Sequence, residues 1–262
     1  MVSVVGRVKR LAHRMFQACG YDFLRYTADN FASLRRAKIV QTQNIALVLD
    51  VGAYEGTYAL QLRQSGYSGR ITSFEPLSQT FSILQQRAAS DPLWSCENLA
   101  IGDSDGMIEM NISGHTSSSS ILPISEAHLK AMPSSATVSK EKVKIARLDS
   151  LLGKMFERNR NTYVKIDVQG FEKHVLAGAR ETLRQTRAIE LELSLVPVYQ
   201  GAALLDEMLD WLTQHDFIMV SIEHVFSDVR TGNMLQADGI FVKQEEAAGG
   251  GAPAKVLKEL KR

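Results

Sequence analysis

The chain has 262 residues, of which 45% are hydrophobic and 23% charged, and a net charge of +1. This composition is typical of one globular domain with short appendages. The small net charge, with no base-reading motif or aromatic stacking platform, gives no reason to expect a nucleic-acid partner. Two cysteines, Cys19 and Cys96, are too few for a disulfide framework or a zinc site. They favour a reducing compartment, and we expect a cytoplasmic protein.

Residues 1–43 are expected to form an N-terminal helical segment. Within it, residues 1–16 alternate apolar with basic positions and lack the apolar core of a signal peptide. An amphipathic helix packed on the domain is the favoured interpretation, and weak peripheral contact with a membrane surface is the alternative. No window approaches about 18 consecutive apolar residues, so we expect no membrane-spanning segment.

The most informative motif follows this segment. Residues 45–51 form an apolar, β-rich run, which is typical of a strand buried in a parallel sheet. Gly52 then permits a sharp turn, and Gly56 lets the next helix, at residues 57–64, approach the strand closely. The N-terminus of that helix presents unpaired N–H groups to a ligand. The motif predicts a nucleotide-binding strand-turn-helix.

Tyr54 stands where the dinucleotide-binding fingerprint has a further glycine. That glycine is needed because the chain there lies almost against a pyrophosphate. A ligand that carries adenosine but no pyrophosphate tolerates a tyrosine, and S-adenosylmethionine is such a ligand. The turn therefore favours S-adenosylmethionine as the cofactor.

A second strand is expected at residues 70–74, and Glu75 and Pro76 follow it. Glu75 comes 25 residues after Asp50, close to the ~20 expected for a ribose-binding acid. A carboxylate at the C-terminal edge of a strand can accept hydrogen bonds from both ribose hydroxyls. The alternative is a loop carboxylate before a proline, but the nearby glycine turn favours ribose binding.

Strands and helices then alternate along the chain. The expected elements are, in order, a helix (78–89), two strands (95–101 and 107–112), a strand (143–145), a short helix (148–151), a strand (162–167), a helix (171–185), a strand (188–194), a helix (204–214) and two strands (217–223 and 239–243). Asp149 is the expected N-cap of its helix. Residues 113–140 are polar and irregular, as in a substrate lid, and residues 245–262 read as a disordered tail.

The order of these elements suggests a mostly parallel, doubly wound sheet with an antiparallel strand at its end. The main domain is expected to span residues 44–244. Class I methyltransferases end in such a hairpin, whereas nicotinamide dehydrogenases usually continue with parallel units. The ending favours methyl transfer.

Eight sequence strings resemble, in this order, the FkbM family of S-adenosylmethionine-dependent methyltransferases. They cover about residues 44–243 and are DVGAYEG, SFEP, ENLAIGDSDG, SSSSIL, ARLDSLL, VKIDVQGFEKHVLAGA, IELELS and ADGIFVK. The resemblance implies an α/β fold of the Rossmann-like class I type, with a mostly parallel seven-stranded sheet, a terminal antiparallel hairpin and helices on both faces. It also implies O-methylation of a hydroxyl, often on a sugar, glycan or secondary metabolite. Tyr54 departs from the family, which more often has Asn there.

Asp167 is the first candidate for the chemistry. Ligands of open α/β sheets bind outside the carboxyl ends of the strands, and Asp167 ends its strand. We expect its carboxylate to emerge beside the reactive end of the cofactor, in part on the family resemblance; capping of the next helix is the alternative. An alcohol is a poor nucleophile until its proton leaves, so methyl transfer to oxygen needs a base or a metal at this place.

Glu190 and Glu192 lie on one face of the strand at residues 188–194. Two carboxylates on an interior strand are costly unless they are solvated, paired or bound to metal. Glu192, nearer the carboxyl edge, is the better candidate, and with Asp167 it predicts a two-carboxylate base or an oxygen-rich magnesium site. For Glu190 we prefer pairing with an arginine or with the backbone of an overlying helix.

Three further residues have two interpretations each, and a fourth has one. His115, in the expected lid, is a competing base or a solvated loop histidine. Asp103 stands where class I methyltransferases commonly have an acid for the adenine amino group, although its sequence is also that of an ordinary turn. Asn98 stiffens that turn or contacts the cofactor. Glu172 matches a family position and is a weaker candidate for orienting the Asp167 loop.

The leading hypothesis is an S-adenosylmethionine-dependent O-methyltransferase with a small-molecule or glycan acceptor. The cofactor-binding candidates are Asp50, Gly52, Tyr54, Gly56, Glu75, Asn98 and Asp103, and the catalytic candidates are Asp167, Glu192 and His115. A nicotinamide oxidoreductase shares the glycine turn and the ribose acid and is one alternative. A non-catalytic cofactor-binding module of the same fold is the other. The sequence leaves metal dependence and oligomeric state open.

Overall fold

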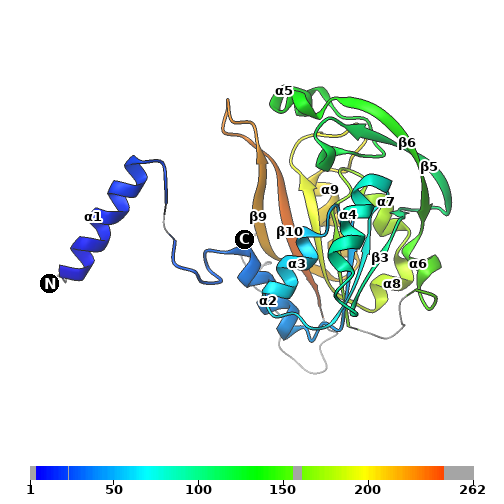
Figure 1. The fold of residues 1–262 in the computed structure, drawn as a ribbon, viewed down its shortest axis with the longest axis horizontal. Helices are drawn as coiled ribbons and strands as arrows, with labels where there is room; N and C mark the ends of the chain where they lie inside the picture. The colour runs from blue at the N-terminus through cyan, green and yellow to red at the C-terminus, as the bar shows by residue number, and fades with distance from the viewer. Residues whose placement is uncertain (1–3, 23, 156–160, 245–262) are drawn as a thin grey trace.

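A computed structural model describes residues 4–22, 24–155 and 161–244 (Figure 1). The predicted disordered tail at residues 245–262 lies outside these residues. The described chain is built on a seven-stranded sheet in the order β3-β2-β1-β7-β8-β10-β9. Its strands are β1 (Leu47–Val51), β2 (Arg70–Phe74), β3 (Trp94–Glu97), β7 (Thr162–Ile166), β8 (Thr186–Ser194), β9 (Phe217–Ser227) and β10 (Met234–Lys243).

The direction of the strands confirms the predicted fold. The first five strands in this order pair in parallel, and β10 pairs antiparallel with both β8 and β9. This is the mostly parallel sheet with a terminal antiparallel hairpin of a Rossmann-like class I methyltransferase. All five residues of β1 are buried, because the central strands of such a sheet are covered on both faces.

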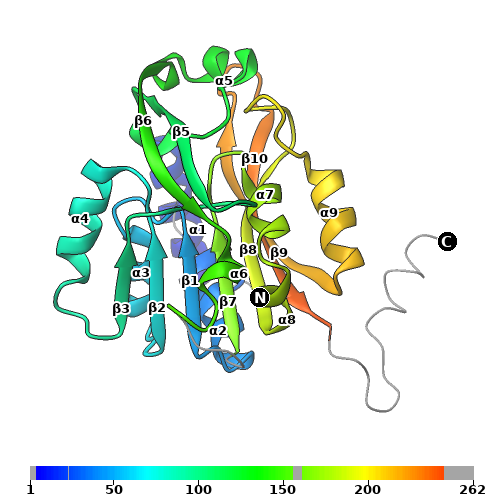
Figure 2. The same cartoon turned by 90° about the vertical axis from the view of Figure 1, so that its right-hand side faces the viewer.

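Helices cover the two faces of the sheet (Figures 1 and 2). One face carries α2 (Ala32–Thr42), α3 (Thr57–Gln64) and α4 (Ser78–Ala88), which share a core with Val48 and Ile71. The other carries α6 (Leu148–Leu151), α7 (Glu172–Ala177), α8 (Arg180–Arg184) and α9 (Leu205–Gln214), which share a core with Leu49 and Ile166. The alternation of β1 side chains between the two cores follows from the period of two in a strand.

A second sheet of three strands, in the order β4-β6-β5, stands beside the first (Figure 2). It is formed by β4 (Ala100–Ile101), β5 (Gly106–Ser113) and β6 (Thr137–Ala146). The strand predicted at residues 95–101 is therefore wrong as one element, because β3 and β4 belong to different sheets. Residues 113–140 are less irregular than predicted, since they contain η1 (Thr116–Ser118), α5 (Glu126–Ala131), η2 (Pro133–Ser135) and the start of β6.

Two predictions about helices are also wrong. The single helix expected at residues 171–185 is broken into α7 and α8 near Gly178, where a Cβ would lie 2.0 Å from a backbone oxygen. Asp149 does not cap α6, whose N-cap residue makes no side-chain bond. The Asp149 carboxylate instead accepts hydrogen bonds from the backbone N–H groups of Glu181 and Thr182 at 3.0 and 2.9 Å. Asp149 therefore caps α8, a helix that comes later in the chain, rather than α6.

The N-terminal helix α1 (Val4–Ala18) lies away from the rest of the molecule (Figure 1). Leu11 and Met15 are each 64% exposed, so packing of this helix on the domain, the favoured expectation, is wrong for the described side chains. In contrast, α2 packs on the sheet through Val40. Among the described residues, no helix combines the length and apolar character needed to cross a membrane.

Candidate functional site

A cavity of about 560 Å³ lies at the carboxyl ends of the parallel strands. The turn after β1, the ends of β2, β7 and β8, residues from the 113–140 segment, and β9 and β10 all contribute to its wall. Its volume falls within the ~300–1,000 Å³ typical of small-molecule sites. The cavity therefore stands where ligands of open α/β sheets bind.

The turn after β1 is shaped by close backbone approach. A Cβ on Gly52 would lie 1.8 Å from the carbonyl oxygen of Asp167, so only glycine lets the ends of β1 and β7 meet. Tyr54 adopts a φ of 51°, in the left-handed region. Gly56 makes room for a different contact from the predicted one, because a Cβ added there would lie 2.8 Å from the side chains of Leu84 and Trp94. Its missing side chain lets α4 and β3 pack closely, rather than α3 against β1.

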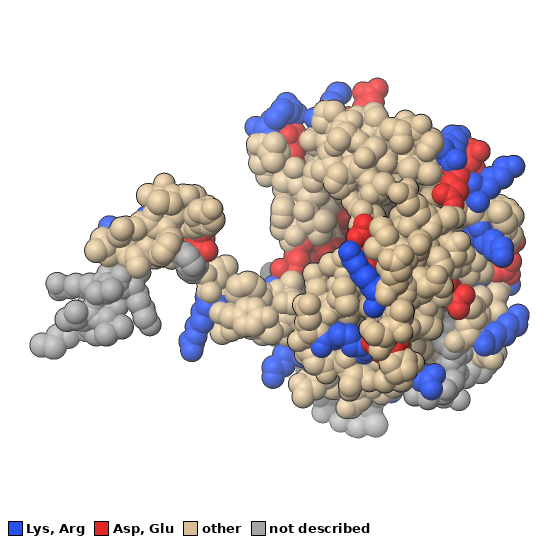
Figure 3. Space-filling view, viewed as in Figure 1, with Lys and Arg blue, Asp and Glu red and all other residues tan. Residues whose placement is uncertain are grey.

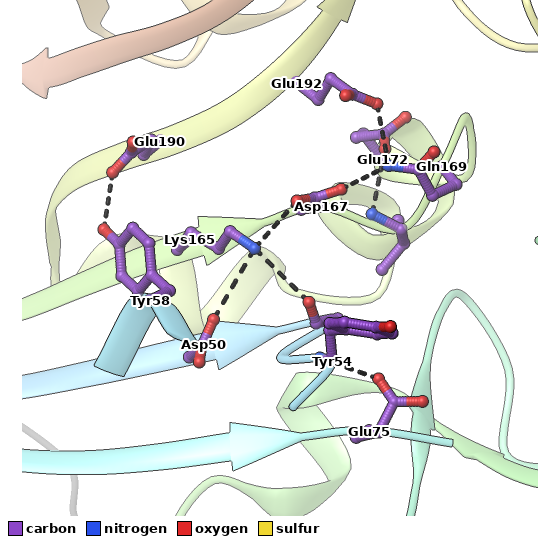
Figure 4. A network of polar contacts seen from close by, with 12 residues as sticks. Asp50, Tyr54, Tyr58, Glu75, Lys165, Asp167, Gln169, Glu172, Glu190 and Glu192 are labelled. Atoms are coloured by element: carbon purple, nitrogen blue, oxygen red, sulfur yellow. Dashed lines mark hydrogen bonds and ion pairs between the residues drawn. The ribbon is translucent and has the colours of Figure 1, made fainter. Parts of the chain in front are cut away.

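Glu75 lies at the end of β2 and is 5% exposed. Its Oε2 accepts the Tyr54 N–H and its Oε1 accepts the Leu77 N–H, both at 2.9 Å (Figure 4). Burial raises the pKa of Glu75 to about 7, although the two backbone bonds act against this rise. The two donors fix the carboxylate at the cavity wall, and each oxygen keeps a lone pair for a ligand hydroxyl.

Lys165 lies at the centre of the site, although the sequence predicts no chemistry for it. Its Nζ lies 3.1 Å from Asp167 Oδ2 and 3.8 Å from Asp50 Oδ1 (Figure 4), and it donates to the Gly52 carbonyl at 3.4 Å. Burial acts to lower the pKa of Lys165, but the charges of Asp167 and Asp50 raise it above its ordinary value. The side chain is therefore an ammonium, and its contacts connect β1 and the turn after it to Asp167 at the end of β7.

Asp50 is fully buried beneath the cavity rather than part of its wall. Its Oδ2 accepts a hydrogen bond from the Ser73 hydroxyl at 3.0 Å, while its Oδ1 has no hydrogen-bond partner among the residues that the structure describes. Burial raises the pKa of Asp50, and Lys165 counteracts the rise. The described contacts make Asp50 a partner of Lys165.

Asp167 and Glu192 are brought together by a glutamine. Gln169 Nε2 donates to Asp167 Oδ1 at 2.7 Å and to Glu192 Oε2 at 3.2 Å (Figure 4). Its Oε1 accepts the Tyr199 hydroxyl at 2.6 Å. Gln236 donates a second amide bond to Glu192 Oε2 at 2.6 Å. The predicted pair of acids therefore exists at the cavity wall, linked through an amide.

The surroundings of Glu192 favour its neutral form. It is 7% exposed, and burial, with the nearby charges of Asp167 and Glu172, raises its pKa well above the usual value. Asp238 faces Glu192 across the β8–β10 pairing, and burial raises its pKa to about 7. The sequence did not point to Asp238, although the register of a recognised hairpin would place it there.

Glu172 holds the loop after Asp167 in place. Its Oε1 accepts the backbone N–H groups of Val168 at 3.2 Å and of Gly170 at 3.1 Å. Burial raises the pKa of Glu172 to about 7. These bonds fit the predicted role of orienting the Asp167 loop.

Glu190 has the structural environment that we preferred for it. Arg36 of α2 donates Nε to its two oxygens at 3.1 and 2.8 Å, and the Tyr58 and Tyr163 hydroxyls each donate to Oε2 at 2.6 Å. Burial acts to raise the pKa of Glu190, but Arg36 and these hydrogen bonds hold it below its usual value. The carboxylate is ionised and fully paired.

The 113–140 segment forms one wall of the cavity. His115 is exposed at its rim, and its Nδ1 lies 2.9 Å from the Ser117 hydroxyl. The Tyr54 hydroxyl lies 2.9 Å from Thr116 Oγ1, which connects the turn after β1 to this wall. Part of the serine run is buried, and Ser120 donates to the Gln169 carbonyl at 2.6 Å. The segment is thus bonded to the loop that carries Asp167.

Besides Asp50 and Gly56, two more predicted cofactor residues lie outside the cavity wall. Asn98 donates to the carbonyls of Glu75 and Pro76 at 3.0 and 2.9 Å, so it braces the turn after β2. Asp103 is exposed, and its Oδ2 lies 3.9 Å from His174 Nε2. Their proposed contact with the cofactor has no support in this geometry and stays a prediction.

The expected magnesium site has no preformed ligand set in the described part of the chain. No group of three or more His, Cys, Asp and Glu side chains gathers there closely enough to hold a metal ion. The Asp167–Glu192 pair is bridged by an amide N–H, which is a donor and cannot ligate a cation.

The family of the chain follows from comparison with known proteins. The model of the methyltransferase FkbM domain matches residues 50–219. The chain belongs to the FkbM methyltransferase family. The predicted family is confirmed, and it is a family of methyltransferases.

One relative of this FkbM methyltransferase is the 2-O-methyltransferase NoeI of Sinorhizobium fredii (strain NBRC 101917 / NGR234). It is 25% identical over 193 residues, which cover 71% of this chain and 79% of NoeI. Among solved structures, an S-adenosylmethionine dependent methyltransferase from Mesorhizobium loti has a TM-score of 0.45 at 10% identity, covering 82% of this chain and 99% of that one. TehB from Haemophilus influenzae has a TM-score of 0.44 at 12% identity, covering 81% and 61%.

Proposed function

We propose that this FkbM methyltransferase transfers a methyl group from S-adenosylmethionine to a hydroxyl oxygen of a sugar, glycan or other small hydroxylated molecule. The observation that carries the proposal is the arrangement of acids around one cavity. Glu75 lies at one part of its wall, Asp167 and Glu192 lie at another, and Lys165 lies between them (Figure 4). The name of NoeI, a 2-O-methyltransferase, supports oxygen as the acceptor atom.

The cavity wall offers contacts for each part of the cofactor. Glu75 accepts the ribose hydroxyls, since its carboxylate is held by two backbone donors. The adenine lies in the apolar part of the wall, which includes Leu77, Ile101 and Met110. The Lys165 ammonium binds the carboxylate of the methionine end, beside the Gly52 turn. Asp50 acts by holding Lys165.

The acceptor hydroxyl then lies against Asp167. S-adenosylmethionine, when bound, would supply the methyl group to this oxygen, and the electron pair of the broken carbon–sulfur bond would stay on sulfur. The hydroxyl proton passes to the Asp167 carboxylate, which acts as the general base. Glu192, in its neutral form, offers an O–H to a second polar group of the acceptor. Residues 113–140 cover the acceptor, with His115 at the rim.

The sequence left two alternative functions open, and the family match affects only the first of them. A nicotinamide oxidoreductase is disfavoured, because the matched family is one of methyltransferases. A non-catalytic module would keep the same cavity and is separated from an enzyme only by turnover. The test is methyl transfer from labelled S-adenosylmethionine to a panel of glycans and hydroxylated small molecules.

The Asp167→Asn variant makes that test specific. Loss of the base should lower kcat about 10²- to 10⁴-fold, while the affinity for S-adenosylmethionine, measured by calorimetry, stays close to that of the wild type. Asp210→Asn is the matched control, since Asp210 is exposed on α9 away from the cavity wall. Binding of the cofactor without transfer to any acceptor would favour the module, and full activity of Asp167→Asn would remove Asp167 as the base.

A further inference from the structure

Asp238 is an acid of the cavity wall that the proposed methyl transfer leaves unused. It lies on β10, and it makes no hydrogen bond or ion pair with any residue that the structure describes. Burial raises its pKa to about 7, and the charge of Asp167 adds to the rise. A carboxyl group that is largely buried without a partner is costly, so this part of the wall calls for a ligand that supplies the partner.

The strand pairings place Asp238 in a row of acids. Asp238 pairs with Glu192 of β8 on one side and with Glu223 of β9 on the other, and the register of β7 with β8 brings Asp167 beside Glu192. Residues that pair directly across strands point to the same face of a sheet. In Figure 3, acidic side chains, drawn in red, lie in a hollow of the face turned to the viewer. The row therefore runs from the proposed base to the edge strand of the sheet.

The cations of this region lie at the ends of the row. Lys165 forms an ion pair with Asp167, and Arg35 forms one with the outermost acid, on β9. Besides Lys165, the only Lys or Arg among the described residues of the cavity wall is Arg36, which is bound by Glu190. The two acids in the middle of the row therefore face the cavity without a counter-ion from the described chain.

Glu192 indicates which of these two acids carries the negative charge. The amides of Gln169 and Gln236 both donate to its Oε2, and no described group donates to its Oε1. The proton of the neutral form, which the surroundings favour, therefore belongs on Oε1, at the cavity wall. Two carboxyl groups that share a site do not both ionise readily. A neutral Glu192 leaves the negative charge to Asp238.

We propose that Asp238 selects an acceptor that carries a protonated amine near its reacting hydroxyl, as an amino sugar does; this inference rests on the proposed O-methyl transfer. The ammonium binds the Asp238 carboxylate, the Glu192 O–H binds an oxygen of the acceptor, and Asp167 receives the hydroxyl proton. Since β8 alone separates β7 from β10, the backbones of Asp238 and Asp167 are about 10 Å apart. One sugar-sized molecule therefore reaches both carboxyl groups.

An ammonium fits this part of the wall better than the other ligands that a carboxylate can bind. A neutral hydroxyl also donates a hydrogen bond, but it does not offset a buried negative charge. A metal ion needs several oxygen ligands, and no group of His, Cys, Asp and Glu gathers closely enough in the described residues to hold one. The ammonium of S-adenosylmethionine would have to reach β10, whereas Lys165 holds the methionine end of the cofactor at β7 in the proposed arrangement.

Matched pairs of acceptors test the amine site. The methyl glycosides of glucosamine and galactosamine are each compared at pH 7 with the N-acetylated form, which lacks the charge, using labelled S-adenosylmethionine. We expect kcat/KM to favour the amino member of a pair about 10- to 100-fold, as for a hydrogen bond to a charged group. Asp238→Asn should remove this preference. Glu223→Gln is the matched control and should keep it, since Glu223 lies next in the row but outside the cavity wall.

Isothermal titration calorimetry with the same glycosides separates the amine site from the proposed reaction. If no methyl group is transferred but the amino glycosides still bind preferentially, and Asp238→Asn loses that preference, the amine site stands without the reaction. Equal transfer and equal binding within each pair for the wild type would overturn the amine site. Binding of the acetylated members that requires Mg²⁺ would also overturn it, because a metal ion would then be the cation. So would a folded Asp238→Asn protein, judged by circular dichroism, that has lost its affinity for S-adenosylmethionine.

Discussion

Glu190 and Glu192 lie two residues apart on the same face of β8, and both are buried, yet their neighbours shift their pKa values in opposite directions. Glu190 accepts hydrogen bonds from the guanidinium of Arg36 and from two tyrosine hydroxyls. Its pKa is held below the usual value. Within the described part of the chain, Glu192 accepts hydrogen bonds from the side-chain amides of Gln169 and Gln236 alone, and its pKa is raised well above the usual value.

The difference between them is a full positive charge. A guanidinium offsets the cost of burying a carboxylate, whereas a neutral amide donor does so only in part. Glu190 therefore fixes α2 to the sheet, as an ionised structural residue. The surroundings of Glu192 favour its neutral form, in which it can donate as well as accept hydrogen bonds, and this suits the acceptor contact that we propose.

The largest effect on stability should come from breaking the ion pair of Glu190 with Arg36. Glu190→Gln leaves the Arg36 guanidinium buried without its counter-ion, since the two side chains are only 4% and 11% exposed. We expect the variant to lose about 3 to 5 kcal/mol of the free energy of unfolding. Urea unfolding at pH 7, followed by circular dichroism, measures this loss.

Glu192→Gln is the matched substitution on the same strand. If Glu192 is neutral at pH 7, replacing it by an amide of the same shape should change the free energy of unfolding by less than about 1 kcal/mol. Equal losses in the two variants would contradict the opposite charge states that we assign to the two glutamates.

The sequence predicted the need for these environments but not the residues that supply them. Two carboxylates on one buried face require partners, so the pairing of Glu190 could be foreseen. Arg36 could not be named, because it lies 154 residues earlier in the chain and meets Glu190 only after α2 packs on the sheet. Patterns of period 2 and 3.6 report local structure and carry no information on such contacts.

The same limit explains the residues that were missed around the cavity. Gln169 bridges two acids because its backbone adopts a φ of 57°, which no sequence pattern at this position predicts. The buried serines of the 113–140 segment read as a flexible loop, because a polar composition does not reveal that hydroxyls are bonded internally. Glu75 was found, since a fixed spacing from a glycine turn does carry information.

Glu75 extends the comparison to an acid whose partners are backbone groups. Glu75→Ala should weaken the binding of S-adenosylmethionine by about 1.5 to 3 kcal/mol, because a charge-assisted contact to the ribose is lost. Isothermal titration calorimetry gives the affinity. Glu97→Ala is the control, since Glu97 ends the neighbouring strand β3 outside the cavity wall. An unchanged affinity for Glu75→Ala would mean that the ribose lies elsewhere.

Glu172 gives the most direct test of how neutral hydrogen-bond donors affect the pKa of a buried acid. Its pKa is raised from 4.5 to about 7 in the folded chain, so the folded state keeps a proton that the unfolded state has lost between these values. Stability that is fully present below about pH 4.5 should therefore fall as the pH rises towards 7. Glu172→Gln has no such proton, so relative to this variant the wild type should lose on the order of 2 kcal/mol of the free energy of unfolding between pH 5 and pH 7.5.

Urea unfolding at several pH values measures the pH dependence of stability for both proteins, and the effects of the raised pKa values of Glu75 and Asp238 cancel in the difference. Parallel curves would show that the two backbone N–H donors suffice to keep Glu172 ionised, and Glu192 with its two amide donors would then need the same reassessment.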